Sequence, residues 1–203
     1  MKKKLIIFDL DGVLINSIGN MQFALNQTSK KLNMNLNFQI YKKYLGLPFE
    51  DIMKNMRIKN NINLIKKNYE MFSIKKINKI KIKKTILNEL NILKKKYYLA
   101  VFTSKNKNRT LKIVKKSNLF DCIITSDDVS RGKPNPEGLN KILNKLKIKR
   151  VNSVYVGDSY YDYKASKSAK IKYAHAMWGY DKKLGKKKNI TKLNYFREIS
   201  KLI

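Results

Sequence analysis

The chain has 203 residues, of which 43% are hydrophobic, and this length supports one core domain with a smaller insertion. A single cysteine, Cys122, excludes an intramolecular disulfide, and no apolar segment is long enough to span a membrane. The formal net charge of +32 would suit a nucleic-acid partner. However, only five of the 46 basic residues are Arg, and the abundant Lys, Asn and Ile share A/T-rich codons. Biased composition therefore explains the charge better than a nucleic-acid partner does.

Residues 1–8 combine lysines with an apolar run, as a secretory signal does. Asp9 and Asp11 make the run too short for a signal peptide, so we expect a cytoplasmic protein with no membrane partner and no specific nucleic-acid partner. The run from Leu5 is instead typical of a buried strand, which we expect to end near Leu14. These patterns do not distinguish a monomer from a dimer.

Two carboxylates, Asp9 and Asp11, follow the apolar run and precede Gly12. Residues two apart on an extended backbone project to the same side, and Gly12 allows the chain to turn sharply after them. Burying two carboxylates is costly unless a cation or a proton neutralises them. The pattern therefore indicates a metal site with one carboxylate placed to do chemistry, and a purely structural metal site is the alternative.

Between this strand and Thr85, apolar residues recur at the spacing of helices. The first such series is Ile18, Met21, Leu25, Thr28 and Leu32. Helical sequence rich in Lys and Asn continues to about Lys84, with a break at Gly46-Leu47-Pro48 and no clear strand. We therefore expect residues 15–84 to form a helical insertion after the first strand.

From Thr85 onward, helices and strands alternate, a pattern typical of a parallel sheet covered by helices. Apolar runs predict strands over residues 97–102, 120–125, 153–156 and 171–177. Helical patterns precede residue 97, cover 106–117 and follow Pro136 and Asp162. The predicted fold is an α/β core made of residues 1–14 and 85–203.

Polar clusters accompany these strands. They are Thr103-Ser104 after the second run, Lys133 in the loop Arg131-Gly132-Lys133-Pro134-Asn135-Pro136, and Gly157-Asp158-Ser159-Tyr160-Tyr161-Asp162 after the fourth run. Taken singly, Thr103 reads as a turn residue, Lys133 as a surface charge, and Asp158 or Asp162 as an acid at a helix start. Because ligands bind at the carboxyl ends of strands in such sheets, we expect the clusters to converge on one site.

With these residues the chain resembles the haloacid dehalogenase superfamily, in particular its phosphoglycolate-phosphatase-like branch. The resemblance rests on four motifs in the family's order: Asp9-x-Asp11-Gly12, Thr103-Ser104, Lys133-Pro134 and Gly157-Asp158-Ser159-x-x-Asp162. It covers nearly the whole chain. It implies a Rossmann-like parallel core with an inserted, mobile α-helical cap over the active site.

The resemblance also implies an Mg²⁺-dependent phosphatase that hydrolyses a small phosphorylated metabolite. Asp9 would be the nucleophile and form an acyl phosphate, and Asp11 would be the general acid and base. Asp9, the backbone carbonyl of Asp11, and Asp158 would hold Mg²⁺, an ion that prefers oxygen ligands. The identity of the phosphate ester is not indicated.

By the same resemblance, Thr103, Ser104 and Gly12 would contact the transferring phosphoryl group. Lys133 would neutralise that group and orient the nucleophile. The supporting residues would be Ser159 and Asp162.

The segment Gly46-Leu47-Pro48-Phe49 loosely resembles the cap loop that contacts substrate in this family, so Leu47 and Phe49 are candidate substrate contacts. Asp11 argues against a dehalogenase, because dehalogenase members lack the second aspartate. Met21 stands where hexose-phosphate mutases carry a histidine. A sugar-phosphate phosphotransferase or mutase is nevertheless the alternative enzyme, and a basic nucleic-acid-binding protein on a phosphatase scaffold is the alternative of another class.

Overall fold

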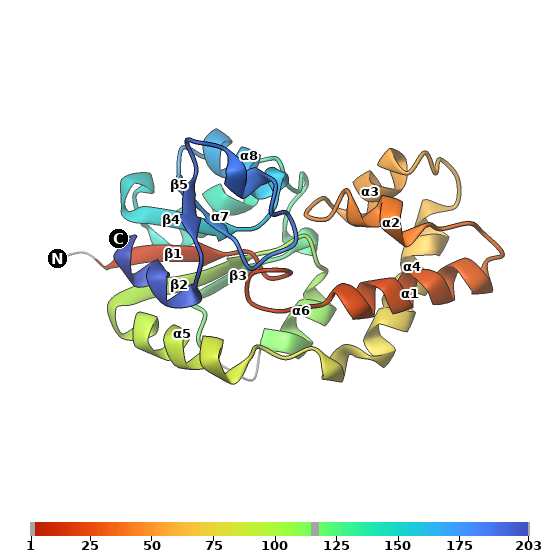
Figure 1. Ribbon diagram of the computed structural model, residues 1–203, viewed down its shortest axis with the longest axis horizontal. Coiled ribbons are helices and arrows are strands. Elements are labelled where there is room, and N and C mark those ends of the chain that lie inside the picture. The colour runs from red at the N-terminus through yellow and green to blue at the C-terminus, as the bar shows by residue number, and fades with distance from the viewer. Residues whose placement is uncertain (1–2, 115–117, 203) are drawn as a thin grey trace.

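A six-stranded parallel sheet forms the centre of the computed structural model, which describes residues 3–114 and 118–202 (Figure 1). The strands are β1 (Lys4–Phe8), β2 (Tyr97–Phe102), β3 (Cys122–Ile124), β4 (Ser153–Gly157), β5 (Lys172–Ala176) and β6 (Thr191–Leu193). Their order is β3-β2-β1-β4-β5-β6, which confirms the α/β fold predicted from the alternating pattern. Because β1 lies between β2 and β4, the residue after β1 opens onto the middle of the sheet edge.

Helices cover both faces of the sheet, because β1 is apolar on both sides. Ile6 and Phe8 pack in one hydrophobic cluster, and Leu5 and Ile7 pack in a second cluster on the opposite face. The first face is covered by α5 (Lys84–Lys96), α6 (Lys107–Val114) and the 3-10 helix η6 (Phe196–Lys201). The second face is covered by α7 (Glu137–Leu146) and α8 (Tyr160–Ser168).

Four further helices lie beyond the carboxyl end of β1 (Figure 1). They are α1 (Ile18–Lys31), α2 (Phe38–Lys42), α3 (Phe49–Asn55) and α4 (Ile62–Lys75). They share a hydrophobic cluster of their own, whose largest buried members include Leu25, Tyr41, Phe49, Met53 and Tyr69. After α4 the chain returns to the sheet, where Ile77 and Ile80 pack in the same cluster as Ile6.

The elements predicted from apolar spacing are largely confirmed, but β1 is shorter than expected. It ends at Phe8, so the expectation of a strand to near Leu14 is wrong. The amides of Leu14 and Ile15 both donate to the carbonyl of Leu10, at 3.0 and 3.1 Å, and this closes a loop after Asp9. Gly12 has a φ of +91° within that loop, a conformation that favours glycine.

Smaller differences concern the ends of elements. The predicted strands 120–125 and 171–177 shorten to β3 and β5, and the helix predicted after Asp162 begins at Tyr160. The helix predicted over 106–117 is α6, and residues 115–117 lie outside the described residues, as do residues 1–2 and 203 of the predicted core. β6 and η6 have no counterpart in the prediction.

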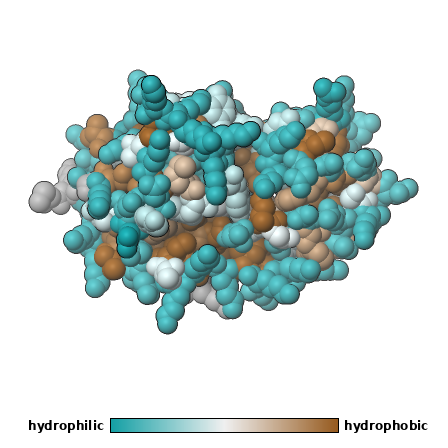
Figure 2. Space-filling view, viewed as in Figure 1, coloured by the Kyte–Doolittle hydropathy of each residue, from teal (hydrophilic) through white to brown (hydrophobic). Residues whose placement is uncertain are grey.

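Hydrophilic side chains dominate the face of the molecule drawn in Figure 2. Cys122 is buried. Over the described ranges 3–114 and 118–202, no helix combines the length and the apolar character needed to cross a membrane.

Gly138 allows α7 to pack closely on β2, and this contact generates a stability prediction. A Cβ at Gly138 would overlap the ring of Phe102, which is 1% exposed. Gly138→Ala should therefore lower the free energy of unfolding by about 1–3 kcal/mol, measured by urea denaturation. Gly19→Ala is the matched control in an exposed helix position, where a Cβ meets nothing, and it should raise stability by up to about 1 kcal/mol. Equal stability of wild type and Gly138→Ala would contradict the close packing.

Candidate active site

Asp9 is the first residue after β1 and is buried, with 5% of its surface exposed. Its amide donates to the carbonyl of Val156 at 2.9 Å, which fixes the backbone against β4. Lys133 Nζ lies 2.5 Å from Asp9 Oδ1 and 2.7 Å from Asp162 Oδ1, and the side chain of Lys133 is 1% exposed. Lys133 therefore forms a buried bridge between two carboxylates and is not a surface charge.

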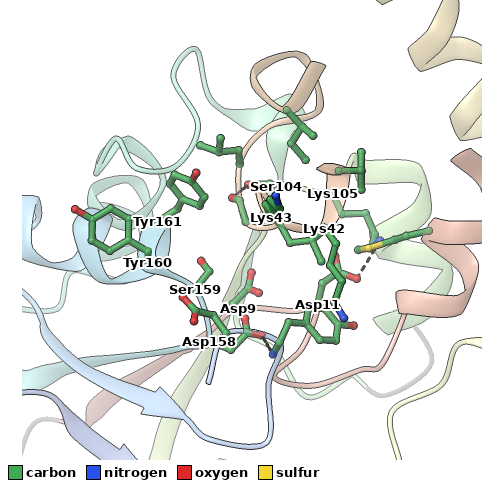
Figure 3. Close-up of a pocket in the computed structure, with 18 of the residues that line it drawn as sticks. Asp9, Asp11, Lys42, Lys43, Ser104, Lys105, Asp158, Ser159, Tyr160 and Tyr161 are labelled. Atoms are coloured by element: carbon green, nitrogen blue, oxygen red, sulfur yellow. Dashed lines mark hydrogen bonds and ion pairs between the residues drawn. The ribbon is translucent and has the colours of Figure 1, made fainter. Parts of the chain in front are cut away.

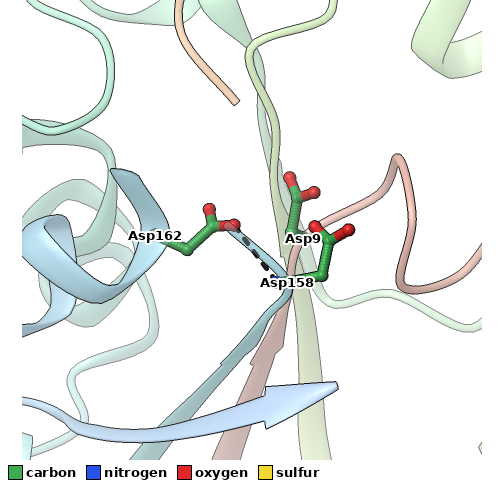
Figure 4. A group of neighbouring side chains, drawn as sticks. All are labelled: Asp9, Asp158 and Asp162. Atoms are coloured by element: carbon green, nitrogen blue, oxygen red, sulfur yellow. Dashed lines mark hydrogen bonds between the residues drawn. The ribbon is translucent and has the colours of Figure 1, made fainter. Parts of the chain in front are cut away.

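Three buried carboxylates meet at the end of the sheet (Figure 4). Asp9 follows β1, Asp158 follows β4, and Asp162 lies in the first turn of α8. One oxygen of each lies within 4.8 Å of the others. We call Asp9, Asp158 and Asp162 the acidic group.

The pKa values of the acidic group differ because burial, neighbouring charges and hydrogen bonds balance differently at each carboxylate. Burial raises the pKa of Asp9 to about 7, even though Lys133 opposes the shift. Burial and the neighbouring Asp9 raise the pKa of Asp158 well above its usual value. Burial also opposes ionisation of Asp162, but Lys133 and hydrogen bonds together hold the pKa of Asp162 below its usual value.

Asp158 has the surroundings of a cation ligand. Its Oδ2 accepts a hydrogen bond from the amide of Tyr180 at 2.6 Å, and in the described part of the chain no Lys or Arg forms an ion pair with Asp158. A Cβ at Gly12 or Gly179 would overlap the Asp158 side chain, so both glycines allow the backbone to pack closely against it. Two buried carboxylates with raised pKa values and oxygen donors fit a divalent metal ion.

Asp162 is already occupied by other partners. Its Oδ1 accepts the Tyr155 hydroxyl at 2.6 Å as well as Lys133. Its Oδ2 accepts the amide and the hydroxyl of Ser159 at 3.0 and 2.6 Å, in a capping box that starts α8. Asp162 is therefore both a helix-capping acid and a partner of Lys133, and Asp9 and Asp158 are the better metal ligands.

Asp11 lies on the other side of Asp9 and is less buried, with 16% of its side chain exposed. The Ser17 hydroxyl donates to Asp11 Oδ1, and Lys105 Nζ lies 3.2 Å from the same oxygen. Ser17 is itself held by the hydroxyl of Tyr180, which accepts from the Ser17 amide at 2.9 Å. Asp11 is thus oriented by two donors.

Thr103 and Ser104 follow β2, as predicted, but differ in their contacts. Thr103 is 1% exposed, and its hydroxyl accepts from the amide of Lys105 at 3.1 Å. The Ser104 hydroxyl donates to the carbonyl of Gly46 at 2.7 Å. Ser104 therefore joins the end of the sheet to the loop before α3.

A cavity of about 790 Å³ lies between the sheet edge and helices α1–α4 (Figure 3). Of the predicted site residues, it is lined by Asp9, Asp11, Leu47, Phe49, Thr103, Ser104, Asp158 and Ser159. Lys133 and Asp162 lie behind Asp9, outside this lining, and Gly12 is buried beside Asp158. The arrangement places one buried carboxylate, a potential metal ligand and hydroxyl groups at the floor of one cavity.

Several residues of the site were missed by the sequence interpretation. Lys105 directly follows Thr103-Ser104, but it is one of 46 basic residues, so its position carried little signal. Tyr155 lies inside an apolar strand, where the sequence indicates a core residue, although its hydroxyl donates a hydrogen bond to Asp162. His175 is 0% exposed, and its Nε2 lies 2.8 Å from the carbonyl oxygen of Asp181.

Known proteins resemble the chain in sequence and in fold. A family model described as haloacid dehalogenase-like hydrolase matches residues 6–176. The phosphoglycolate phosphatase of Aquifex aeolicus is 31% identical over 187 residues, which are 88% of this chain and 87% of that protein. The pyrophosphatase PpaX of Anoxybacillus flavithermus is 39% identical over 83 residues, only 39% of either chain. A crystal structure of a Lactobacillus plantarum protein proposed to be a phosphoglycolate phosphatase shares the fold, with a TM-score of 0.90 at 21% identity over 100% of both chains.

The buried bridge of Lys133 predicts a large effect on stability. Lys133→Met leaves two buried carboxylates without their cation and should lower the free energy of unfolding by about 3–5 kcal/mol. Lys141→Met should change it much less, because Lys141 is an exposed lysine whose ion pair with Glu137 lies at the surface. Adding Asp162→Asn to Lys133→Met should recover part of the loss, since it removes one of the unpaired charges. Urea denaturation measures all three, and equal effects of Lys133→Met and Lys141→Met would contradict the bridge.

Proposed function

The chain belongs to the haloacid dehalogenase-like hydrolases, and we propose that it is an Mg²⁺-dependent phosphatase that hydrolyses a small organic phosphate monoester through an aspartyl phosphate on Asp9. The observation that carries the proposal is the position of Asp9, buried on the floor of the cavity between Lys133 and Asp158. The phosphatases among its relatives support the same class of reaction.

Asp9 is the proposed nucleophile because its carboxylate is rigidly held at the cavity floor. A bond forms between an oxygen of Asp9 and phosphorus, while the bond from phosphorus to the leaving oxygen breaks. Phosphate esters resist attack because anions repel one another, so a fixed positive charge nearby lowers the barrier. Lys133, 2.5 Å from Asp9 Oδ1, is placed to supply that charge and to keep Asp9 oriented.

Asp9, Asp158 and the backbone carbonyl of Asp11 are the proposed ligands of Mg²⁺. When bound, Mg²⁺ supplies charge neutralisation to the phosphoryl oxygens. Gly12 and Gly179 make room for the carboxylate of Asp158, because a side chain at either position would overlap it.

Asp11 is the proposed general acid and base. It donates a proton to the leaving alcohol in the first step and accepts a proton from water when the acyl phosphate is hydrolysed. Ser17 and Lys105 orient its carboxylate toward the cavity. Thr103, Ser104 and the backbone at Gly12 are the proposed contacts of the phosphoryl group, with Ser159 and Asp162 in support.

We also propose that residues 15–84 act as a cap over a core formed by residues 1–14 and 85–203. The separate hydrophobic cluster of α1–α4 and the cavity between these helices and the sheet support this division. Leu47 and Phe49 line the cavity from the cap side and are placed to contact the leaving group. The hydrogen bond between Ser104 and Gly46 would hold the cap in its closed position.

The metal assignment predicts that hydrolysis of a phosphate ester stops in chelator and returns with Mg²⁺. Ca²⁺ should restore it poorly, because its larger and looser coordination misplaces Asp9 for attack. Mg²⁺ should also raise the Tm of the wild-type protein but not that of Asp158→Asn, while the exposed control Asp127→Asn keeps the shift. Full turnover of chelated, metal-free protein would refute the assignment.

Asp9 and Asp11 should have separable roles in turnover. Asp9→Asn should lower turnover of an aryl phosphate by roughly 10³-fold or more and leave no phosphorylated protein detectable by mass spectrometry. Asp11→Asn should lower turnover by about 10²- to 10⁴-fold, because both proton transfers lose their group. Asp127→Asn, an exposed substitution of the same type, serves as the control. An Asp9→Asn protein with near wild-type turnover would rule out the aspartyl phosphate.

A further inference from the structure

Two buried cations, Lys105 and Arg109, line the cavity on the side away from the acidic group. Lys105 lies between β2 and α6, and Arg109 lies one turn further along, in α6. The side chain of Lys105 is 3% exposed and that of Arg109 is 6% exposed. Figure 3 shows Lys105 beside Asp11 in this cavity. We call Lys105 and Arg109 the cation pair.

The cation pair is incompletely matched by carboxylates. Arg109 Nε donates to Asn106 at 3.0 Å and its NH1 donates to Ser73 at 3.4 Å, and both acceptors are neutral. The nearest ion-pair distance of Arg109 is 3.9 Å, to Glu70. Burying a guanidinium is costly without a close anion, and arginine is well shaped to bind carboxylate or phosphate with two donors.

The ion pair of Lys105 indicates which part of the substrate would carry such an anion. Its ion-pair partner is Asp11, the proposed proton donor to the leaving group. The cation pair therefore lies on the leaving-group side of the site, and Lys133 lies on the nucleophile side with Asp9. A neutral leaving group would add no negative charge here, and the cation pair would keep only Asp11 at 3.2 Å from Lys105 and Glu70 at 3.9 Å from Arg109.

Aromatic side chains lie next to the cation pair in the cavity. The guanidinium of Arg109 lies 5.3 Å from the ring centre of Tyr69, and the Tyr69 hydroxyl accepts from Tyr41 at 3.3 Å. Both tyrosines line the cavity and are nearly fully buried. Exposed lysines, such as Lys42 and Lys43, also line the cavity and raise the local concentration of anions, but they are common over the whole surface.

We propose that Lys105 and Arg109 bind a second anionic group, a carboxylate or a phosphate, carried by the leaving group of the substrate. The inference rests on the proposed function, because it takes the transferring phosphoryl group to lie at Asp9. It assigns part of the substrate selectivity to the loop after β2 and to α6, and not to the cap loop at Leu47 and Phe49 alone.

The test compares pairs of substrates that differ in charge, using the full chain with Mg²⁺. Phosphoglycolate is compared with its primary amide, which has nearly the same shape and no carboxylate. Pyrophosphate is compared with 4-nitrophenyl phosphate, which lacks the second phosphate but has a leaving group of similar basicity. We expect kcat/KM for at least one charged member to exceed that of its uncharged partner by roughly tenfold or more, and the pair that shows it identifies the anion. Ratios near one for both pairs would overturn the proposal.

Substitutions then test which residues produce the ratio. Arg109→Met and Lys105→Met should each lower it by roughly tenfold, and Arg109→Lys should retain part of it because the charge remains. Lys112→Met is the matched control, since Lys112 is an exposed lysine of α6. The ratio is the readout because loss of Lys105 also changes the surroundings of Asp11 and lowers turnover of every substrate. Equal losses on charged and uncharged substrates would show that these residues only support Asp11 or the fold.

A binding measurement separates this proposal from the proposed function. In the Asp9→Asn background, calorimetry should show that phosphoglycolate or pyrophosphate binds more tightly than inorganic phosphate, and that Arg109→Lys weakens this advantage. If binding shows the advantage but wild-type protein hydrolyses no phosphate ester, the proposed function fails and the anion site stands. If esters are hydrolysed but no advantage is found, the anion site fails and the proposed function stands.

Discussion

Negative charge buried at the carboxyl end of β1 is the constraint on which the rest of the site depends. Three carboxylates share a space in which their oxygens lie within 4.8 Å of one another, and one lysine neutralises two of them. The third, Asp158, is surrounded by glycines and a backbone amide. Strand order, the capping box of α8 and the loop that carries Lys133 all serve to bring these groups together, and the cost of leaving them apart or unpaired is high.

Positive charge is divided between two sides of the cavity. Lys133 lies behind Asp9, sealed from solvent, while Lys105 and Arg109 line the side next to Asp11 and the helices α1–α4. The two sides differ in what they neutralise: the first is matched by carboxylates of the core, whereas the second is matched only in part. The lysines on the surface create a general attraction for anions, but the buried cations have fixed positions and can therefore discriminate between them.

Much of the architecture was predictable because its signals are local. The run 97–102 is apolar and ends at Thr103, and it is β2. The end of β1 was not predictable from the sequence. Leu10, Val13 and Leu14 are buried in a loop, and an apolar run does not distinguish a buried loop from a strand. β6 is only Thr191–Leu193, and two of its three residues are exposed. It is therefore too short to show the alternation of apolar and polar residues that indicates a strand. The convergence of strand ends predicted that Asp9 and Asp158 lie together, and the resemblance to a known family singled out Lys133. Lys105 was missed because lysine is abundant, and Arg109 because contacts across the cavity are not encoded by spacing.

Arginine is scarce in this chain, and the surroundings of Arg109 give a physical reason why an arginine, and not a lysine, occupies this position. Arg109 is one of five arginines, and its Nε, NH1 and NH2 point to three different residues, Asn106, Ser73 and Glu70. A lysine ammonium is a single point and cannot reach three acceptors arranged around a plane. Lysine suffices wherever only charge matters, so Arg109 marks a position in this chain where the shape of the guanidinium is used as well.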